Sequence, residues 1–463
     1  MKNQFYNFED KRMDLFERLV KKGWNNELSY EELKKIANDF KKKYNFDKED
    51  MPFINNHLRV AMGLDPNKDT EFSTELSDIS DMDRFKGEIV TKIEGPCEYC
   101  DEKTDENECL NSCKYEAHIY RRGKGPVIVK DNCLNCGKCI VDCSFGAIED
   151  KIEFLPIINM LKDKKQSVYA TVAPSIVGQF GEDVTMGQLR TALKLMGFED
   201  MIEVSLFADI LTIKEAFEFN ELVTSENDFF LTSCCCPVWL NLTEKNYPKL
   251  FNHMSPSISP MIASGRILKE FYPDSKVVFI GPCVAKKAEA KSSNRNDIDF
   301  VLTYRELDKI FHALNIKLSE LPPDDKDQAS FAGRVYARTG GVSFSVKTVV
   351  NRISPRRLIK FKSKKVDGVK DCKKILDDLS MGKDIDSNFI EGMGCEGGCV
   401  GGPRTNIDKV KATNIVNEFG EDSLIMTPFD NANVMKILKT LGVKKIEDVI
   451  EKKEVSDVFK RDK

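Results

Sequence analysis

Four closely spaced cysteines carry the clearest chemical signal in this chain. Cys133-x2-Cys136-x2-Cys139-x3-Cys143 has the spacing of a bacterial-type [4Fe–4S] ligand run, in which three thiolates hold one cluster and the fourth reaches its neighbour. The alternative is a pair of structural zinc sites, but such sites usually use two separated cysteine pairs. The spacing therefore favours iron–sulfur ligation.

A second run lies just upstream, Cys97-x2-Cys100-x8-Cys109-x3-Cys113, and differs by six extra residues in its middle. Two such runs predict two clusters that exchange their fourth ligands. One cluster would be held by Cys97, Cys100, Cys109 and Cys143, and the other by Cys113, Cys133, Cys136 and Cys139.

Three more cysteine motifs follow: the triplet Cys234-Cys-Cys before Pro237, Cys283 after Gly-Pro, and Cys395-x3-Cys399 among glycines. One cysteine of the triplet, together with the other three, would supply four thiolates, the complement of a third cubane. Glycine lets the backbone approach a bulky cofactor closely.

Composition supports this view and excludes other classes. The 463 residues hold 15 Cys but only 4 His, so thiolate ligation dominates. The net charge of −5 gives no sign of a nucleic-acid or membrane partner. The charged N-terminal stretch lacks an apolar signal core, so we expect a cytoplasmic protein.

The elements that must position these residues change along the chain. The sequence of residues 1–90 predicts a helical extension, in which Ser29 and Glu32 have the spacing of a capping box. Residues 91–150 are too short for a large core and predict a small α+β domain that metal clusters hold together. Residues 151–440 predict an α/β domain, and residues 441–463 a surface helix that frays.

Within the α/β domain, short apolar runs predict strands, with helices between them. Helix starts are expected at Thr185 and at Pro237. The predicted strands are Ser167–Val172, Met201–Leu206, Phe229–Leu231, Lys276–Ile280 and Ile298–Leu302.

Over residues 91–430 the motifs resemble those of the [FeFe]-hydrogenases, whose catalytic domain carries TSCCPxW, PCxxKxxE and ExMxCxxxCxxGG patterns in this order. The resemblance implies the fold of the iron-only hydrogenase large domain, preceded by a ferredoxin-like domain with two [4Fe–4S] clusters. It also implies an H-cluster, a cubane joined to a diiron unit with CO, cyanide and azadithiolate.

Site residues are carried over by position in the motifs. The cubane ligands would be Cys236, Cys283, Cys395 and Cys399. Around the diiron unit, Lys286, Ser175 and the backbone near Pro174 would contact cyanide, and Met393 would pack beside the bridging carbonyl. By themselves Lys286 and Lys287 could be surface lysines, and Met393 could be ordinary core packing.

The resemblance also implies a proton relay of a thiol, Glu, Ser and Glu. Here it would run through Cys235, Glu215, Ser255 and Glu218. The extra cysteine leaves a second register open, in which Cys234 is the relay and Cys235 the ligand. Without the resemblance, a Glu pair three residues apart is usually a solvated helix face.

The chain departs from the usual pattern in its cysteine triplet, in Gly281, and in the ending Gly-Gly-Pro403. These departures resemble the clostridial subgroup called group B. The implied activity is reversible H2 oxidation, with H2, protons, a soluble electron carrier such as ferredoxin, and hydrogenase maturation proteins as partners. The alternatives are a non-catalytic hydrogenase-like iron–sulfur assembly factor, an H2 sensor and a simple electron carrier.

Overall fold

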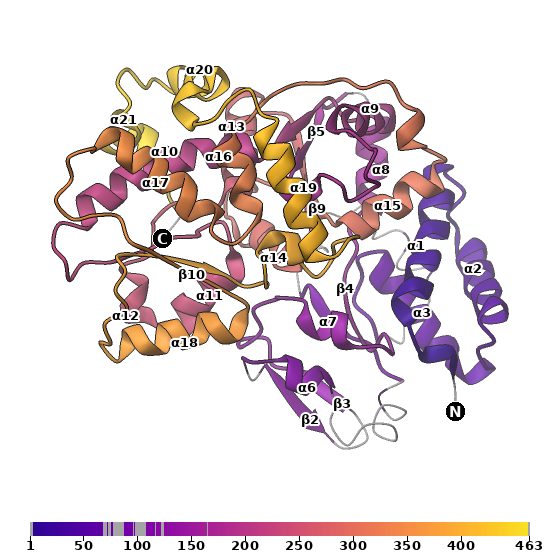
Figure 1. Cartoon of the computed structure of the whole chain (residues 1–463). Helices are drawn as coiled ribbons and strands as arrows, with labels where there is room; N and C mark the ends of the chain where they lie inside the picture. The colour runs from indigo at the N-terminus through magenta and orange to yellow at the C-terminus, as the bar shows by residue number, and fades with distance from the viewer. Residues whose placement is uncertain are drawn as a thin grey trace. The chain divides into compact units, whose positions relative to one another are not determined.

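Contacts between residues divide the chain into two units, whereas its composition suggested four segments. One unit comprises Met1–Gln166, Cys283–Lys291 and Phe300–Lys317, and a second comprises Ser167–Pro282, Ser292–Asp299 and Leu318–Lys463. The computed structural model (Figure 1) describes residues 3–67, 72, 76, 88–95, 97, 108–115, 117–121, 125–163 and 165–461.

The first unit begins with the expected helices. In α2 the Ser29 hydroxyl accepts the Glu32 N–H at 3.2 Å, so this predicted helix start is confirmed. Helix α1 buries Leu15, Phe16 and Leu19 and packs against α15, which lies almost 300 residues later in the chain. The helices are η1 (Asn3–Phe5), α1 (Phe8–Trp24), α2 (Tyr30–Lys43), η2 (Lys48–Asp50), α3 (Met51–Ala61), α6 (Glu108–Ser112), α7 (Lys138–Asp142), α8 (Leu155–Lys162), α14 (Val284–Ser292) and α15 (Tyr304–Ala313).

The cysteine runs of this unit lie among short elements. Strand β1 pairs with β4 antiparallel, with Val90 opposite Asp150, and β2 pairs with β3 in the same sense. Such short strands bury little apolar surface, as expected for a domain that depends on its clusters. The strands are β1 (Val90–Lys92), β2 (His118–Arg121), β3 (Gly125–Ile128), β4 (Ile148–Asp150) and β9 (Phe300–Leu302).

The second unit is built on parallel strands, which confirms the α/β class. Strand β5 pairs with β6 and β8 on its two sides, with Ala170 opposite Met201 and Val278. In another sheet β11 lies between β10 and β7. The strands are β5 (Val168–Val172), β6 (Met201–Glu203), β7 (Phe230–Leu231), β8 (Lys276–Ile280), β10 (Ser363–Asp367) and β11 (Phe389–Met393).

Helices cover these sheets. Thr185 and Gln188 form the predicted capping box of α9, and α11 begins at Pro237 as expected. The helices are η4 (Pro174–Ile176), α9 (Met186–Met196), α10 (Ser205–Leu222), α11 (Pro237–Asn246), α12 (Pro248–Phe251), α13 (Pro260–Phe271), η5 (Leu318–Glu320), α16 (Phe331–Arg334), η6 (Val335–Ala337), α17 (Gly341–Ile353), α18 (Val369–Ser380), η7 (Cys399–Gly401), α19 (Lys409–Glu421), η8 (Pro428–Asp430), α20 (Ala432–Thr440), α21 (Asp448–Glu451) and α22 (Lys453–Val458).

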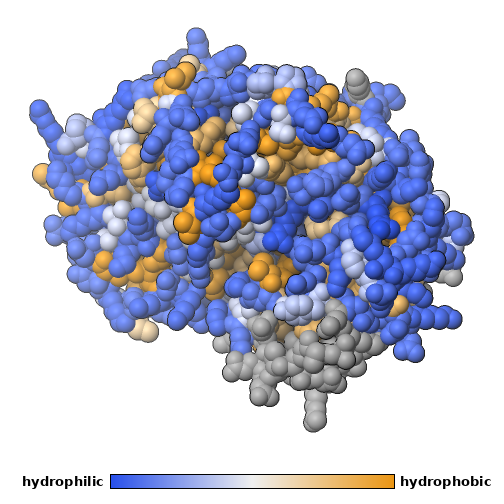
Figure 2. All heavy atoms as spheres, turned by 45° about the vertical axis from the view of Figure 1, so that its right-hand side comes forward, coloured by the Kyte–Doolittle hydropathy of each residue, from blue (hydrophilic) through white to orange (hydrophobic). Residues whose placement is uncertain are grey.

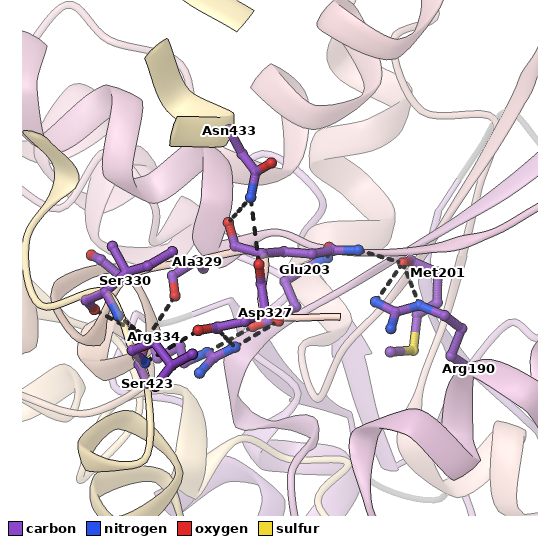
Figure 3. A network of polar contacts seen from close by, with 12 residues as sticks. Arg190, Met201, Glu203, Asp327, Ala329, Ser330, Arg334, Ser423 and Asn433 are labelled. Atoms are coloured by element: carbon purple, nitrogen blue, oxygen red, sulfur yellow. Dashed lines mark hydrogen bonds and ion pairs between the residues drawn. The ribbon is translucent and has the colours of Figure 1, made fainter. Parts of the chain in front are cut away.

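The predicted strand Met201–Leu206 is too long, because the chain turns from β6 into α10 at Ser205. A buried ion-pair network holds this turn (Figure 3). The Arg334 guanidinium donates to both carboxylate oxygens of Glu203, at 3.0 and 2.9 Å, and to Asp327 at 2.8 Å. The start of α10 is thereby fixed to α16, and through Asp327 to the segment before it. Helix α10 carries two of the expected relay residues.

The tail also differs from the expected fraying surface helix. Residues Val449, Val455 and Phe459 are buried, and the Ile258 N–H donates to the Phe459 carbonyl at 2.9 Å. An antiparallel bridge joins Ser257 to Lys460. The tail is therefore part of the second unit's core.

Hydrophilic residues cover most of the face drawn in Figure 2, with groups of apolar residues between them. Among the residues that the structure describes, no helix is long and apolar enough to cross a membrane.

Candidate metal centre and proton route

Four of the expected ligands line one cavity in the first unit. Cys133 and Cys136 lie in the loop before α7, Cys139 lies on α7, and Cys113 follows α6. Asn135 and Gly137 have φ angles of 52° and 77°, which coil this loop around the cavity. The thiols surround a common space, whereas no three His, Cys, Asp or Glu among the described residues converge as one ion would need. This arrangement fits the corners of a four-iron cluster.

The donor set of the other run is described in part. Cys109 is buried and packs with Cys139 and Cys143 in one apolar cluster, while Cys100 lies outside the described residues. Burial raises the pKa of Cys143 to about 11, and the Ala147 N–H donates to its sulfur at 3.3 Å. Such N–H groups are the donors that cluster thiolates accept.

Two other residues lie close to these runs. A Cβ on Gly125, whose φ is 66°, would meet the Cys97 sulfur at 2.6 Å, so only glycine fits beside this thiol. His118, which has no ligand-like spacing in the sequence, also lines the cavity of the four thiols.

The cysteine triplet connects β7 to α11 through a strained turn. Ser233 has a φ of 69°, which is uncommon for a residue with a side chain, and its carbonyl accepts the Cys236 N–H at 2.9 Å. This turn sends neighbouring thiols in different directions. Cys235 and Cys236 both pack against the core cluster that contains Met393 and Tyr336.

Of the three thiols, Cys234 is the one that meets the expected relay. Its sulfur lies 3.3 Å from Glu215 Oε1, and also 3.3 Å from the Ile258 carbonyl. The favoured sequence assignment gave this place to Cys235, so the contact supports Cys234 as the relay, as in the second register, whereas Cys236 is the ligand of the first register. Cys236 instead accepts the Gly394 N–H at 3.2 Å, directly before Cys395.

The remaining relay candidates gather behind Cys234 on buried side chains, not on a solvated helix face. Glu215 accepts the Thr232 hydroxyl at 2.6 Å, and burial raises the pKa of its carboxyl. The Ser255 hydroxyl donates to Glu218 Oε2 at 3.1 Å and also lies within hydrogen-bonding reach of Glu215. A continuous polar chain thus runs from Cys234 to Glu218 inside an apolar core.

The Cys395–Cys399 loop is held by close backbone contacts. Gly397 and Gly398 have φ angles of 82° and 91°, and the Thr339 N–H donates to the Gly397 carbonyl at 2.9 Å. A Cβ on Gly398 would lie 2.8 Å from the Thr339 nitrogen. The left-handed backbone therefore favours glycine at both positions, and the close approach to Thr339 requires it at Gly398.

Glu391 anchors the segment that approaches this loop. Its carboxylate accepts the N–H groups of Gly340 and Ser343 at 2.7 and 2.8 Å, and the Ser343 hydroxyl at 2.6 Å. These donors lie at the start of α17, where the helix dipole favours an anion. The motif contains Glu391, but nothing in the sequence predicted this role.

The other expected cofactor contacts lie in the second unit at the ends of β5 and β11. Ser175 is fully buried in η4, which begins at Pro174. The next residues pack onto the loop of Cys399, since Val177 contacts the cluster formed by Ala337, Val400, Ala412 and Val416. Met393 ends β11 and is 1% exposed.

Cys283 begins the part of α14 that belongs to the first unit, while Pro282 before it belongs to the second. In the second unit the Pro282 carbonyl accepts the Arg404 N–H at 3.1 Å, just beyond the Cys399 loop. In the first unit, Lys286 pairs with Glu289 at 2.6 Å. Neither Lys286 nor Lys287 is a surface lysine, since they are 7% and 0% exposed.

Comparison with known proteins also indicates a hydrogenase-like protein. The family model described as "Iron only hydrogenase large subunit, C-terminal domain" matches residues 166–403. Iron hydrogenase 1 of Clostridium pasteurianum is 28% identical over 437 residues, which cover 78% of this chain and 72% of that protein.

A cytosolic Fe-S cluster assembly factor, NAR1 of Scheffersomyces stipitis, is 28% identical over 157 residues, covering 31% of this chain and 29% of that protein. A solved structure of [FeFe]-hydrogenase HydA1 from Chlamydomonas reinhardtii is 21% identical, has a TM-score of 0.52, and covers 62% of this chain and 93% of the other. This likeness shows the shared fold of the catalytic domain. With the family model matching more than half of its length, the chain belongs to the iron-only hydrogenase family.

Proposed function

We propose that this protein is a catalytic [FeFe]-hydrogenase that interconverts H2, protons and electrons. The observation that carries the proposal is the buried chain from Cys234 through Glu215 and Ser255 to Glu218. A protein that only carries or assembles clusters has no need of a proton path. Buried carboxylates are costly, so their alignment behind a thiol favours an enzyme.

The residue types that the motifs supply would suit an H-cluster. Cys236, Cys283, Cys395 and Cys399 would hold its cubane, and the Gly394 N–H on Cys236 supports this cysteine as the ligand of the triplet. Lys286, Ser175, Pro174 and Met393 would surround the diiron unit. When bound, the H-cluster supplies the electron store and the Lewis-acid iron at which H2 is formed or split.

The protein side chains would move the proton. The Cys234 thiol donates to Glu215, and burial, which raises the pKa of Glu215, favours a carboxyl that can hold a proton. The Ser255 hydroxyl donates to Glu218, and it would accept a hydrogen bond from Glu215 when that carboxyl is protonated. The side chains packed around this row of polar groups exclude bulk water from the proton route.

Electrons would enter through the two ferredoxin-type [4Fe–4S] clusters of the first unit, from a soluble carrier such as ferredoxin in the cytoplasm. The gathering of Cys113, Cys133, Cys136 and Cys139 around one cavity supports one of these clusters. Maturation proteins would have to supply the diiron unit, since no side chain can provide CO or cyanide.

An infrared spectrum of anaerobically matured protein tests the proposal. We expect bands of metal-bound CO and cyanide that shift under H2. A cluster-loaded protein that shows no such bands, even after addition of a diiron precursor, would contradict the proposal. The similarity to the NAR1 assembly factor would then give the better account.

A further inference from the structure

Lys214 lies at the outer end of the polar chain and has no place in the relay described above. Its side chain is fully buried on α10, one residue before Glu215. The ammonium group pairs with Glu218 Oε1 and donates to the Ser257 hydroxyl at 2.8 Å. Both partners belong to the surroundings of the relay, because Ser257 lies two residues beyond Ser255.

The two carboxylates of the chain therefore have different surroundings. The side-chain groups that hydrogen-bond to Glu215 are neutral: the hydroxyls of Thr232 and Ser255, and the thiol of Cys234. Glu218 shares the Ser255 hydroxyl but has a cation on its other oxygen. A neighbouring cation favours the charged form of a carboxylate, whereas burial favours the protonated form and here outweighs the opposing effect of the neutral donors.

We propose that Lys214 is a positioning residue of the proton route, which keeps Glu218 ionised as the proton acceptor while Glu215 carries the proton. This inference rests on the proposed hydrogenase function for its role, but the charge asymmetry itself does not require turnover. The ion pair also holds the carboxylate of Glu218 so that its other oxygen, Oε2, accepts the hydroxyls of Ser255 and Ser257, at 3.1 and 3.5 Å. A proton that leaves Glu215 through Ser255 then reaches a base that is already charged and oriented.

Other charged or titratable groups face this site and belong in any account of its pH dependence. They come from four elements besides α10: the cysteine triplet, the segment of Tyr336, α11, and the buried end of the tail. The groups are Cys234, Tyr336, Glu244 and Arg461. Arg461 donates to the Ser257 carbonyl at 2.9 Å, so a second cation lies behind the hydroxyl that Lys214 contacts.

The test is the infrared band of protonated carboxylic acids, recorded on the full chain with its iron–sulfur clusters but before the diiron unit is added. Glu215→Gln identifies the band of Glu215 in the unaltered protein. In Lys214→Met we expect an additional carboxylic-acid band at neutral pH, which the unaltered protein lacks, because Glu218 loses its cation and takes up a proton. The double variant Lys214→Met/Glu218→Gln should lose that additional band.

Matched variants separate charge from packing. Lys214→Arg keeps the cation and should show the same carboxylic-acid bands as the unaltered protein. Lys214→Gln serves if the methionine variant does not fold, and it should again show the additional band. In the matured enzyme, Lys214→Met should lower H2 turnover by about 10²-fold, the scale of one proton-transfer group, with CO and cyanide bands unchanged.

A folded, cluster-loaded Lys214→Met or Lys214→Gln protein with no carboxylic-acid band beyond those of the unaltered protein would overturn the inference. This result does not depend on the hydrogenase proposal, because the diiron unit is not yet present. Conversely, the additional carboxylic-acid band in Lys214→Met, in a protein that never acquires CO and cyanide, would support the charge asymmetry but contradict the proposed function.

Discussion

Two buried lysines, one in each unit, show opposite uses of the same side chain. Lys287 in the first unit donates to Asp150 at 2.8 Å, to Glu306 at 2.6 Å and to the Lys151 carbonyl at 2.7 Å. Its three donors are all occupied. Lys214 in the second unit meets one carboxylate and one hydroxyl.

The surroundings of Lys287 are those of a structural centre. Burial alone would lower its pKa, but the carboxylates of Asp150 and Glu306 raise it above the ordinary value. Arg12 of α1 adds a second cation, 3.0 Å from Glu149. This cluster joins α1, β4, α14 and α15 within the first unit, so the N-terminal extension helps to fix the helix that follows Cys283.

The comparison teaches that buried charge alone does not identify a functional group. Where each carboxylate has a cation, as around Lys287, protons are not free to move. Where a carboxylate has only neutral donors, as at Glu215, burial raises its pKa and a proton can be held. Substitutions in both regions can therefore test the distinction.

The largest effect is expected at the inner end of the proton route. Cys234→Ala removes the thiol next to Glu215 and should lower H2 turnover by about 10²- to 10⁴-fold. Iron content and the CO and cyanide bands should remain. Cys235→Ala is the matched control and should lower turnover far less. A larger loss in Cys235→Ala than in Cys234→Ala would instead identify Cys235 as the relay.

Breaking the structural cluster should act on stability. Lys287→Met leaves the buried Glu306 without its cation and Asp150 with only Arg12, at 3.6 Å, which we expect to cost about 3–5 kcal/mol in the free energy of unfolding. Denaturant unfolding of the cluster-loaded protein measures this change. Lys409→Met, at an exposed pair with Glu396, should change it by less than about 0.5 kcal/mol. Equal losses in both variants would remove the distinction.

Glu391 is a buried carboxylate held without any lysine. Glu391→Gln places an amide against donors of Gly340 and Ser343 and should cost about 1–3 kcal/mol. Because those donors position the segment beside the Cys399 loop, retention of the H-cluster iron should fall too, as iron analysis would measure. Glu396→Gln, on an exposed glutamate of the same loop, is the control.

The smallest effect concerns pH. Burial raises the pKa of Asp209 to about 6, although Ser330 and Asn431 donate to it. A raised carboxyl pKa adds stability below the ordinary aspartate value, and this stability is lost as pH rises through about 6. From pH 5 to 8 the unfolding free energy should fall by roughly 1–2 kcal/mol, and Asp209→Asn should remove this fall. An equally steep profile in the variant would assign the dependence to another group.

Much of the site could be predicted from spacing, because cluster ligands must follow one another at fixed intervals. The choice within the triplet could not, since it depends on the left-handed turn at Ser233. Strand β10 was missed because its sequence, SKKVD, is charged and largely exposed and has no apolar pattern. Lys214 and the buried Phe459 depend on contacts between distant segments, which no local pattern reveals.

Exchange of H2 with D2O tests the central claim most directly, because it needs both H2 splitting and a working proton route but no electron carrier. Matured wild-type protein should form HD, and Cys234→Ala should form it at least about 10²-fold more slowly with unchanged CO and cyanide bands. Wild-type protein that has those bands but forms no HD would contradict the account, as would a Cys234→Ala variant that exchanges at the wild-type rate.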